Sequence, residues 1–357
     1  MTYRERVLNT FAFKPVDRNP VSVMEGNVWP SLMEYFTNKH GFKDKEEVFN
    51  YLNDDFRWFL AGTREQLGHH TADADASLES GTYSDGEGRL LAGAKTPDDV
   101  KRLYNPDASL VIYPDFKLAR ETWPDHALIF IPVWMPIFSG ACEAFGMEEA
   151  MVTMLTEPKL FTAYAEQQTN HAIEVFRKGF EFGANKYFDF AWIGDDFASE
   201  LAPIISPELW RKLVKPHLTK IIDFIKKSGM KVLFHSCGAV RDFIPDFTEM
   251  GIDGLLIVQT TAKGMEIDGL ARDFGGKIVF FGGMDVQWLL TQGTPQQVAD
   301  EAISNCRAFE KCGGYVVSNC HTCMPDVKGE NIEAMCKAIS EPADANCSPM
   351  HPGLVKF

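Results

Sequence analysis

The sequence predicts an α/β fold, specifically a (β/α)8 TIM barrel with an N-terminal extension and an insertion over the barrel mouth. Eight apolar or β-rich segments recur along 357 residues, and the stretches between them are long enough for helices. Several of these segments are continuously apolar, as in parallel strands that are covered on both faces. A doubly wound open sheet is the alternative, but no G-x-G-x-x-G motif follows any of the segments.

The expected strands are residues 20–24, 54–60, 128–134, 186–193, 231–236, 253–258, 277–283 and 314–319. A capping Ser and a first-turn Pro, Ser206-Pro207, predict a helix from Leu209 to Lys227. Thr294-Pro295 predicts another through Phe309. The polar stretch 61–127 is the expected insertion. Residues 1–341 are expected to form one domain, and residues 342–357 an extended tail.

Composition limits the partners and the location of the protein. The chain is 45% hydrophobic and 24% charged, and its net charge of −15 disfavours nucleic acid and anionic membranes as partners. No segment approaches the roughly 20 apolar residues of a membrane span, and the N-terminus does not resemble a signal peptide. A cytoplasmic protein is therefore expected, in which the eight cysteines are thiols or metal ligands. The sequence is compatible with a homodimer but does not specify the oligomeric state.

Two predicted strands end in residues that bind metals. His235 and Cys237 follow one apolar segment, and Cys320, His321 and Cys323 follow the last one. In a barrel such strand ends converge, and imidazole and thiolate are ligands that suit zinc. A His-x-Cys pair alone is weak evidence for a metal, because both residues often have only a structural role. A second strand end that is rich in cysteine favours a metal site. The third ligand stays open among Cys320, His321 and Cys323; Cys320 is favoured because it lies nearest the strand end.

Carboxylates occupy other predicted strand ends. Asp195 and Asp196 follow the fourth strand, and Glu25 the first. Each is a candidate general acid or base, or a clamp on a polar substrate group, although helix capping is the competing interpretation. Asp285 follows two glycines that allow a ligand to approach the backbone closely, which is also the pattern of an ordinary turn.

Aromatic side chains gather near the same strand ends. They could form an apolar pocket for an aromatic substrate or a large planar cofactor, or simply pack in the core. The candidates are Trp29, Trp134, Trp192 and Phe197.

The chain resembles the uroporphyrinogen decarboxylase superfamily over nearly its whole length. The resemblance rests on the start of the chain (4–8 and 15–21), Ile205-Ser206-Pro207 with Lys215-Pro216, His-x-Cys-Gly at 235–238, Gly-Gly-x-Asp at 282–285, and Glu330-Asn331-Ile332. It implies a (β/α)8 barrel. The decarboxylases of this superfamily bind acidic tetrapyrroles through arginines just after the first strand, where this chain has none. The other branch comprises corrinoid-dependent methyltransferases, whose zinc is held by a His-x-Cys pair and a later Cys.

In this branch His235 and Cys237 match the zinc-binding pair. The later Cys of the family aligns with His321, beside Cys320, when counted back from Glu330 without gaps. The resemblance therefore implies a zinc-dependent methyltransferase. It would work with a corrinoid (cobalamin) on a separate protein, since no D-x-H-x-x-G motif is present. The aromatic residues favour O-demethylation of a methoxylated aromatic. The alternatives are methyl transfer from a methylcobamide to a thiol such as coenzyme M, a cofactor-free decarboxylase, and a tetrapyrrole-binding protein without activity.

Overall fold

The computed structural model describes residues 1–23, 30–64, 89–133 and 137–341. Glu25, Trp29, Trp134 and the tail 342–357 lie outside the described residues. Within the described ranges, none of the helices has the length and hydrophobicity that crossing a bilayer requires.

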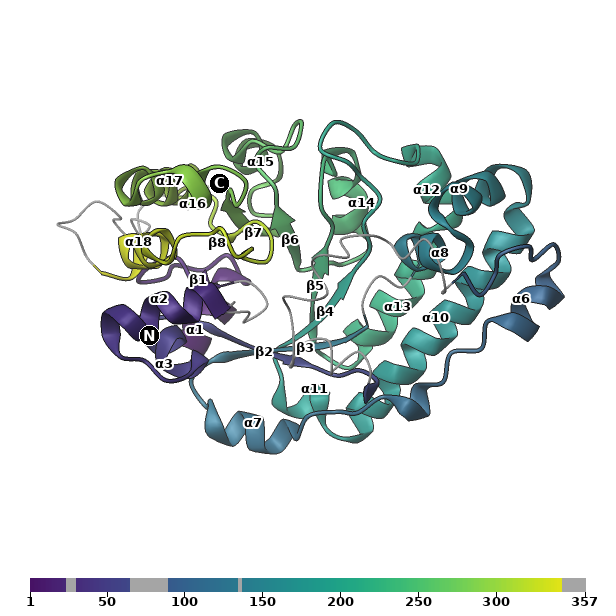
Figure 1. Ribbon diagram of the computed structural model, residues 1–357, viewed down its shortest axis with the longest axis horizontal. Helices are drawn as coiled ribbons and strands as arrows, with labels where there is room; N and C mark the ends of the chain where they lie inside the picture. Colours follow the sequence, from purple (N-terminus) through teal and green to yellow (C-terminus); the bar gives the residue numbers. More distant parts are fainter. Residues whose placement is uncertain (24–29, 65–88, 134–136, 342–357) are drawn as a thin grey trace. The chain divides into compact units, whose positions relative to one another are not determined.

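Eight strands form one sheet, as in a (β/α)8 TIM barrel, and the fold-class prediction is confirmed (Figure 1). In the order β1-β8-β7-β6-β5-β4-β3-β2, each strand from β2 to β8 neighbours the next strand of the chain, and β1 pairs with β8. Each lies within a few residues of its predicted position. The strands are β1 Val21–Ser22, β2 Phe56–Leu60, β3 Ala127–Val133, β4 Phe190–Gly194, β5 Lys231–His235, β6 Gly254–Val258, β7 Val279–Met284 and β8 Tyr315–Asn319.

Helices alternate with the strands along the chain. Before β3 come α1 Tyr3–Thr10, α2 Pro30–His40, α3 Lys45–Tyr51, α6 Pro97–Leu103, the 3-10 turn η2 Ala108–Leu110, and α7 Phe116–Thr122. Between β3 and β6 come α8 Phe138–Phe145, α9 Met147–Thr156, α10 Pro158–Glu181, α11 Ala184–Tyr187, α12 Pro207–Leu213, α13 Lys215–Lys227, η3 Arg241–Phe243 and α14 Ile244–Glu249. The last helices are α15 Ile267–Phe274, α16 Leu289–Gln292, α17 Pro295–Ala308 and α18 Gly329–Ser340.

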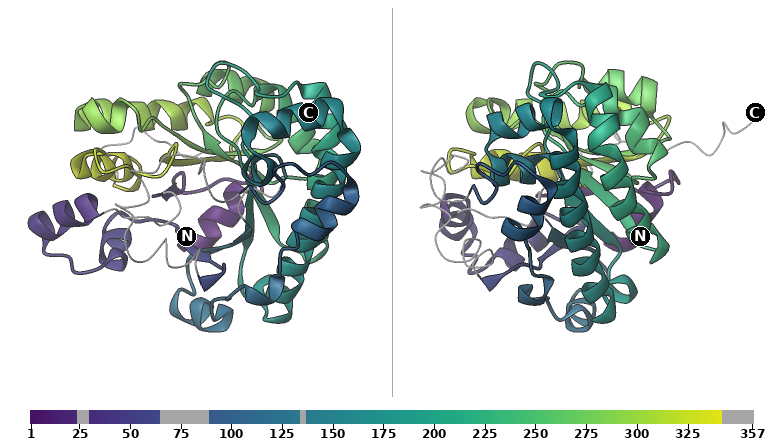
Figure 2. Two further views of the ribbon diagram at one scale, coloured as in Figure 1. Left: turned by 45° about the vertical axis from the view of Figure 1, so that its right-hand side comes forward. Right: turned by 90° about the vertical axis from the view of Figure 1, so that its right-hand side faces the viewer.

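The chain divides into two compact units. Unit 1 consists of Met1–Trp58, Trp123–Leu128 and Asp253–Phe357, and unit 2 of Phe59–Thr122 and Ile129–Ile252. In unit 2, α10 packs against α13, and both helices run along the outside of β4 and β5 (Figures 1 and 2). The residues of β4 are all buried, as the continuously apolar sequence predicts for a strand covered on both faces.

The expected helix 209–227 is two helices, which corrects that prediction. α12 ends at Leu213 and α13 begins at Lys215, with Pro216 in its first turn. Proline has no backbone N–H and clashes with the preceding turn, so one continuous helix cannot pass through this position. The predicted caps are confirmed, because the side chains of Ser206 and Thr294 accept from Leu209 N and Gln297 N.

In unit 1, a buried aspartate ties the N-terminal extension to the first two strands. Asp55 accepts hydrogen bonds from Arg6 Nη1 at 2.6 Å, from Arg18 Nη1 at 2.8 Å and from the backbone N–H of Val21 at 2.8 Å. Because Asp55 is fully buried, its charge requires these partners. The N-terminal extension is therefore held by a specific ion-pair network.

Candidate metal centre

The candidate metal centre lies where β4 and β5 end. Gly194 is in register with His235, and the N–H of Asp195 continues the ladder by donating to the carbonyl of His235 at 3.0 Å. Parallel strands end at the same edge of a sheet, so Asp195, Asp196 and Cys237 emerge together.

Three side chains form what we call the donor group: Asp196, His235 and Cys237. Their ligand atoms all lie within 4.8 Å of one another. His235 Nε2 is 3.5 Å from Cys237 Sγ and 3.7 Å from Asp196 Oδ1. The Cys237 N–H donates to Asp196 Oδ1 at 2.7 Å. All three residues belong to unit 2.

The donor group fits a zinc ion. Bond lengths of about 2.0–2.3 Å in a tetrahedral arrangement place neighbouring ligand atoms about 3.3–3.8 Å apart. The two distances measured from His235 Nε2 are 3.5 and 3.7 Å, close to this spacing. Thiolate, imidazole and carboxylate are all zinc ligands, so the chemistry of the set agrees with its geometry.

The imidazole ring is held in place by packing. His235 is 1% exposed, and the ring of Trp192 meets it edge to face at 5.6 Å. A side chain at Gly194 would press on it, since an added Cβ would lie 3.1 Å from His235 Cβ. These contacts orient the ring before any ligand binds.

The loop after Cys237 packs on the loop after Asp196. Gly238 has φ of +83°, and a Cβ on it would lie 2.6 Å from the carbonyl oxygen of Ser199. The N–H of Ala239 donates to that same carbonyl at 2.8 Å. Only glycine allows this approach, which keeps together the two loops that carry the donor group.

Asp195 has a different environment from Asp196. Its two carboxylate oxygens accept the N–H groups of Phe138 at 2.9 Å and Ser139 at 2.8 Å, at the start of α8. The side chain is fully buried, and desolvation raises the pKa of its carboxyl to about 7, although the two N–H groups oppose the shift. The helix-capping interpretation therefore describes the Asp195 contacts.

Ser139 is a supporting residue that sequence reasoning missed. Its hydroxyl donates to the carbonyl of Asp196 at 3.1 Å and accepts the Asp196 N–H at 3.0 Å. No spacing pattern could have identified this residue, because it lies on α8, 57 positions before Asp196.

The other predicted residues whose positions are described have contacts within their own units. Phe197 has no exposed surface and packs against Trp210 and Phe243 with ring centroids 5.3 and 4.8 Å apart. Asp285, in unit 1, accepts the N–H groups of Gln287, Trp288 and Leu289, the last of which is the first residue of α16.

The cysteine-rich segment after β8 belongs to unit 1. Cys320 and Cys323 are buried, and burial raises the pKa of the Cys323 thiol to about 12. His321 is exposed. The N–H of Cys320 donates to the carbonyl of Met284 at 2.8 Å. The choice of a third ligand among these residues stays a prediction.

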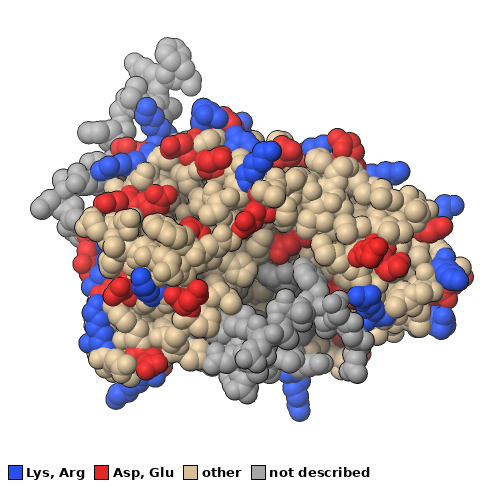
Figure 3. All heavy atoms as spheres, turned by 45° about the horizontal axis from the view of Figure 1, so that its top comes forward, with Lys and Arg blue, Asp and Glu red and all other residues tan. Residues whose placement is uncertain are grey.

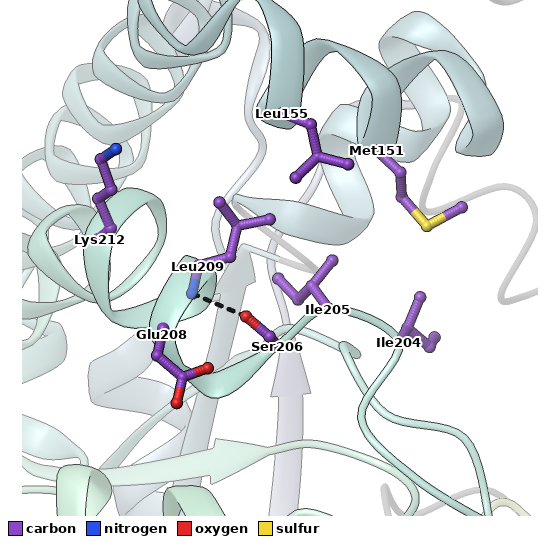
Figure 4. A pocket seen from close by; sticks show the side chains of 8 residues that line it. All are labelled: Met151, Leu155, Ile204, Ile205, Ser206, Glu208, Leu209 and Lys212. Carbon is purple, nitrogen blue, oxygen red and sulfur yellow. Dashed lines mark hydrogen bonds between the residues drawn. The ribbon is translucent and has the colours of Figure 1, made fainter.

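A pocket of about 430 Å³ lies between α9 and α12 in unit 2 (Figure 4). Its lining is mostly apolar, and no residue of the donor group contributes to it. The lining residues are Met151, Leu155, Ile204, Ile205, Ser206, Glu208, Leu209 and Lys212.

Comparisons with known proteins agree with this architecture. Residues 82–342, more than half of the chain, match the family model of uroporphyrinogen decarboxylase (URO-D). A methyltransferase from Methanosarcina mazei has a similar structure, with a TM-score of 0.67 and 17% identity over 95% of this chain and 98% of the other. A second solved structure, the IOLI protein with a binding zinc atom, aligns over 90% of this chain and 96% of its own at 13% identity, with a TM-score of only 0.37. The comparison with curated proteins gives no match.

Proposed function

The chain belongs to the uroporphyrinogen decarboxylase family, and from this premise we propose that it is a zinc-dependent methyltransferase. It would move a methyl group between a small substrate and the cobalt of a separate corrinoid protein. The observation that carries the proposal is the convergence of Asp196, His235 and Cys237 at one point. The similar fold of the Methanosarcina mazei methyltransferase supports it.

His235 and Cys237 are the proposed metal ligands, with Cys320 as the predicted third. Zinc, when bound, supplies a Lewis acid that polarises the heteroatom of a methyl donor or keeps a thiol as its thiolate. The chain supplies orientation, because Trp192 fixes the imidazole and Gly238 lets the two loops pack closely.

The favoured reaction is O-demethylation of a methoxylated aromatic. In this reaction the bond between the methyl carbon and the ether oxygen would break, with the oxygen keeping its electron pair, and a Co(I) corrinoid on the partner would supply the pair for the new bond to carbon. The leaving phenoxide needs a proton or a cation. The proposed assisting carboxyl groups are those of Asp195 and Glu25; Asp195 also accepts the two N–H groups at the start of α8.

The aromatic pocket of this reaction is proposed from Trp29, Trp134 and Trp192. Trp192 is the member whose position is described, and it lies against His235. Phe197 has the surroundings of a core residue, so a direct contact with substrate is not part of the proposal. Asp285 remains a predicted substrate contact.

A methyl-transfer assay tests the proposal. The protein is mixed with a Co(I) corrinoid protein and a panel of methoxylated aromatics, and the absorption spectrum of the methylated corrinoid is followed. The expected result is methylation with the wild type and at least a hundredfold slower methylation with Cys237→Ala. A thiol-methylating enzyme would instead consume methylcobalamin when a thiol is added.

The family match also admits a decarboxylase. That activity would release CO2 from a carboxylated tetrapyrrole without added metal or corrinoid. Decarboxylation that survives in Cys237→Ala, with no methyl transfer in any direction, would overturn the proposed function.

A further inference from the structure

We propose that Asp196 is itself a ligand of the metal, through a carboxylate oxygen. Unit 2 would then provide an oxygen, a nitrogen and a sulfur to one ion. The inference rests on the zinc site of the proposed function, but it does not require methyl transfer to occur.

The spacing of the donor atoms is the first argument. A His-x-Cys pair by itself defines one edge of a coordination polyhedron, here 3.5 Å between His235 Nε2 and Cys237 Sγ. Asp196 Oδ1 adds a second edge of 3.7 Å from the same nitrogen. Both edges are close to the roughly 3.5 Å that separates ligands of tetrahedral zinc.

The nitrogen that faces Asp196 is the second argument. A carboxylate that only supports a metal-bound histidine contacts the ring nitrogen opposite the metal. Here Asp196 Oδ1 and Cys237 Sγ both lie near Nε2. The carboxylate is therefore on the metal side of the ring, where a ligand belongs.

The fixation of Asp196 is the third argument. Its backbone N–H and carbonyl both bond to the Ser139 hydroxyl, and its Oδ1 accepts the Cys237 N–H. An ionised carboxylate has about four acceptor sites, so the hydrogen bond from Cys237 leaves capacity for an ion. The side chain is 19% exposed, which leaves it open to a metal arriving from solvent.

Adjacent acidic residues thus have separate tasks. Asp195 directs both oxygens to the N–H groups of α8, whereas Asp196 directs its carboxylate to the donor group. In this inference Asp196 takes the third ligand position that the proposed function assigned to Cys320, so the set of one oxygen, one nitrogen and one sulfur leaves one tetrahedral position for a substrate atom.

The test compares zinc binding by the full-length wild type, Asp196→Asn and Asp242→Asn. Asparagine keeps the shape of Asp196 and an oxygen for the Cys237 N–H, but it removes the charged ligand. Asp242 is an exposed acid of η3 in the same unit, so Asp242→Asn controls for loss of one negative charge. Zinc affinity is measured by competition with a chromophoric chelator, and thermal unfolding checks the fold of each metal-free variant.

Zinc affinity is expected to fall about tenfold or more in Asp196→Asn and to stay unchanged in Asp242→Asn. With Co(II) in place of zinc, the d–d bands should change in Asp196→Asn while the thiolate-to-cobalt band from Cys237 persists. Wild-type affinity and spectrum in Asp196→Asn would overturn the inference and leave the proposed function intact. A wild type that binds no zinc would overturn both the inference and the proposed function. Zinc binding without methyl transfer would overturn only the proposed function.

Discussion

Two consecutive aspartates show how position, rather than residue type, decides chemistry. Asp195 and Asp196 are equivalent in the sequence, where both were candidates for acid–base work. In the structure one is fully buried beneath α8 and the other is partly exposed beside His235. The sequence could identify the acidic pair at a strand end. It could not assign the two tasks, because the deciding contacts come from Phe138 and Ser139, far away in the chain.

The raised pKa of Asp195 predicts a pH-dependent stability. Its folded-state pKa is about 7 and the ordinary value is 3.8, so the folded state binds the proton more tightly. The protonated Asp195 carboxyl therefore makes its full contribution to the free energy of unfolding below pH 3.8, and this contribution is lost as the pH rises towards 7. In urea unfolding at several pH values, the stability of the wild type relative to Asp195→Asn should decline from pH 4 to pH 7. A constant difference across this range would contradict the assignment.

At the scale of elements, the strands were the most predictable part of the chain. The segment 231–236 contains the apolar, β-forming run Val232-Leu233-Phe234, so the strand and its approximate position follow from local sequence. The break between α12 and α13 shows the limit of the periodic pattern. Apolar spacing continues through Val214, and Pro216 ends the helix only through its backbone chemistry.

The close packing at Gly238 predicts that metal binding depends on a loop glycine. Gly238→Ala would push a methyl group against the Ser199 carbonyl and separate the loops that carry Asp196 and Cys237. Gly251→Ala is the matched control, because Gly251 has a similar φ of +81° but nothing within 4 Å of its added Cβ. Both should lose about 1 kcal/mol of stability from backbone strain. Only Gly238→Ala should also bind zinc more weakly in a chelator competition; equal zinc affinities would refute the packing argument.

The Asp55 network predicts a large stability loss at one residue. Asp55→Ala leaves the buried Arg6 and the partly buried Arg18 without their shared carboxylate, and should lower the free energy of unfolding by about 3–5 kcal/mol. Asp17→Ala removes a carboxylate that also pairs with Arg6 but is 43% exposed, so its cost should be about 1 kcal/mol or less. Chemical denaturation of both variants measures the difference. Similar losses would mean that burial does not set the strength of this network.

At the scale of the whole molecule, charge predicts how a corrinoid protein would associate. The chain carries a net charge of −15, and acidic and basic side chains are interspersed on the face drawn in Figure 3. A docking partner with basic patches would be attracted over several ångströms, and salt screens that attraction. The second-order rate of methyl transfer should therefore fall as ionic strength rises from 0.01 to about 0.15 M. A rate independent of salt would exclude electrostatic steering.

The fold and the family could be predicted from sequence because they depend on patterns spread along the whole chain. Strand periodicity and motifs such as His-x-Cys-Gly at 235–238 supply that information. The complete ligand set could not be predicted, because it depends on which side chains meet in space. The approach of Asp196 to His235 is set by the register of β4 and β5, which no local spacing encodes.

The zinc content of the purified protein is the most direct test of the central claim, that the ends of β4 and β5 form a metal centre. Elemental analysis after exposure to zinc and removal of loosely bound ions should give about one zinc per chain for the wild type. Cys237→Ala and His235→Ala should retain almost none, with thermal unfolding as the check that each variant is folded. A folded wild type that holds no zinc, or variants that hold as much as the wild type, would contradict the account.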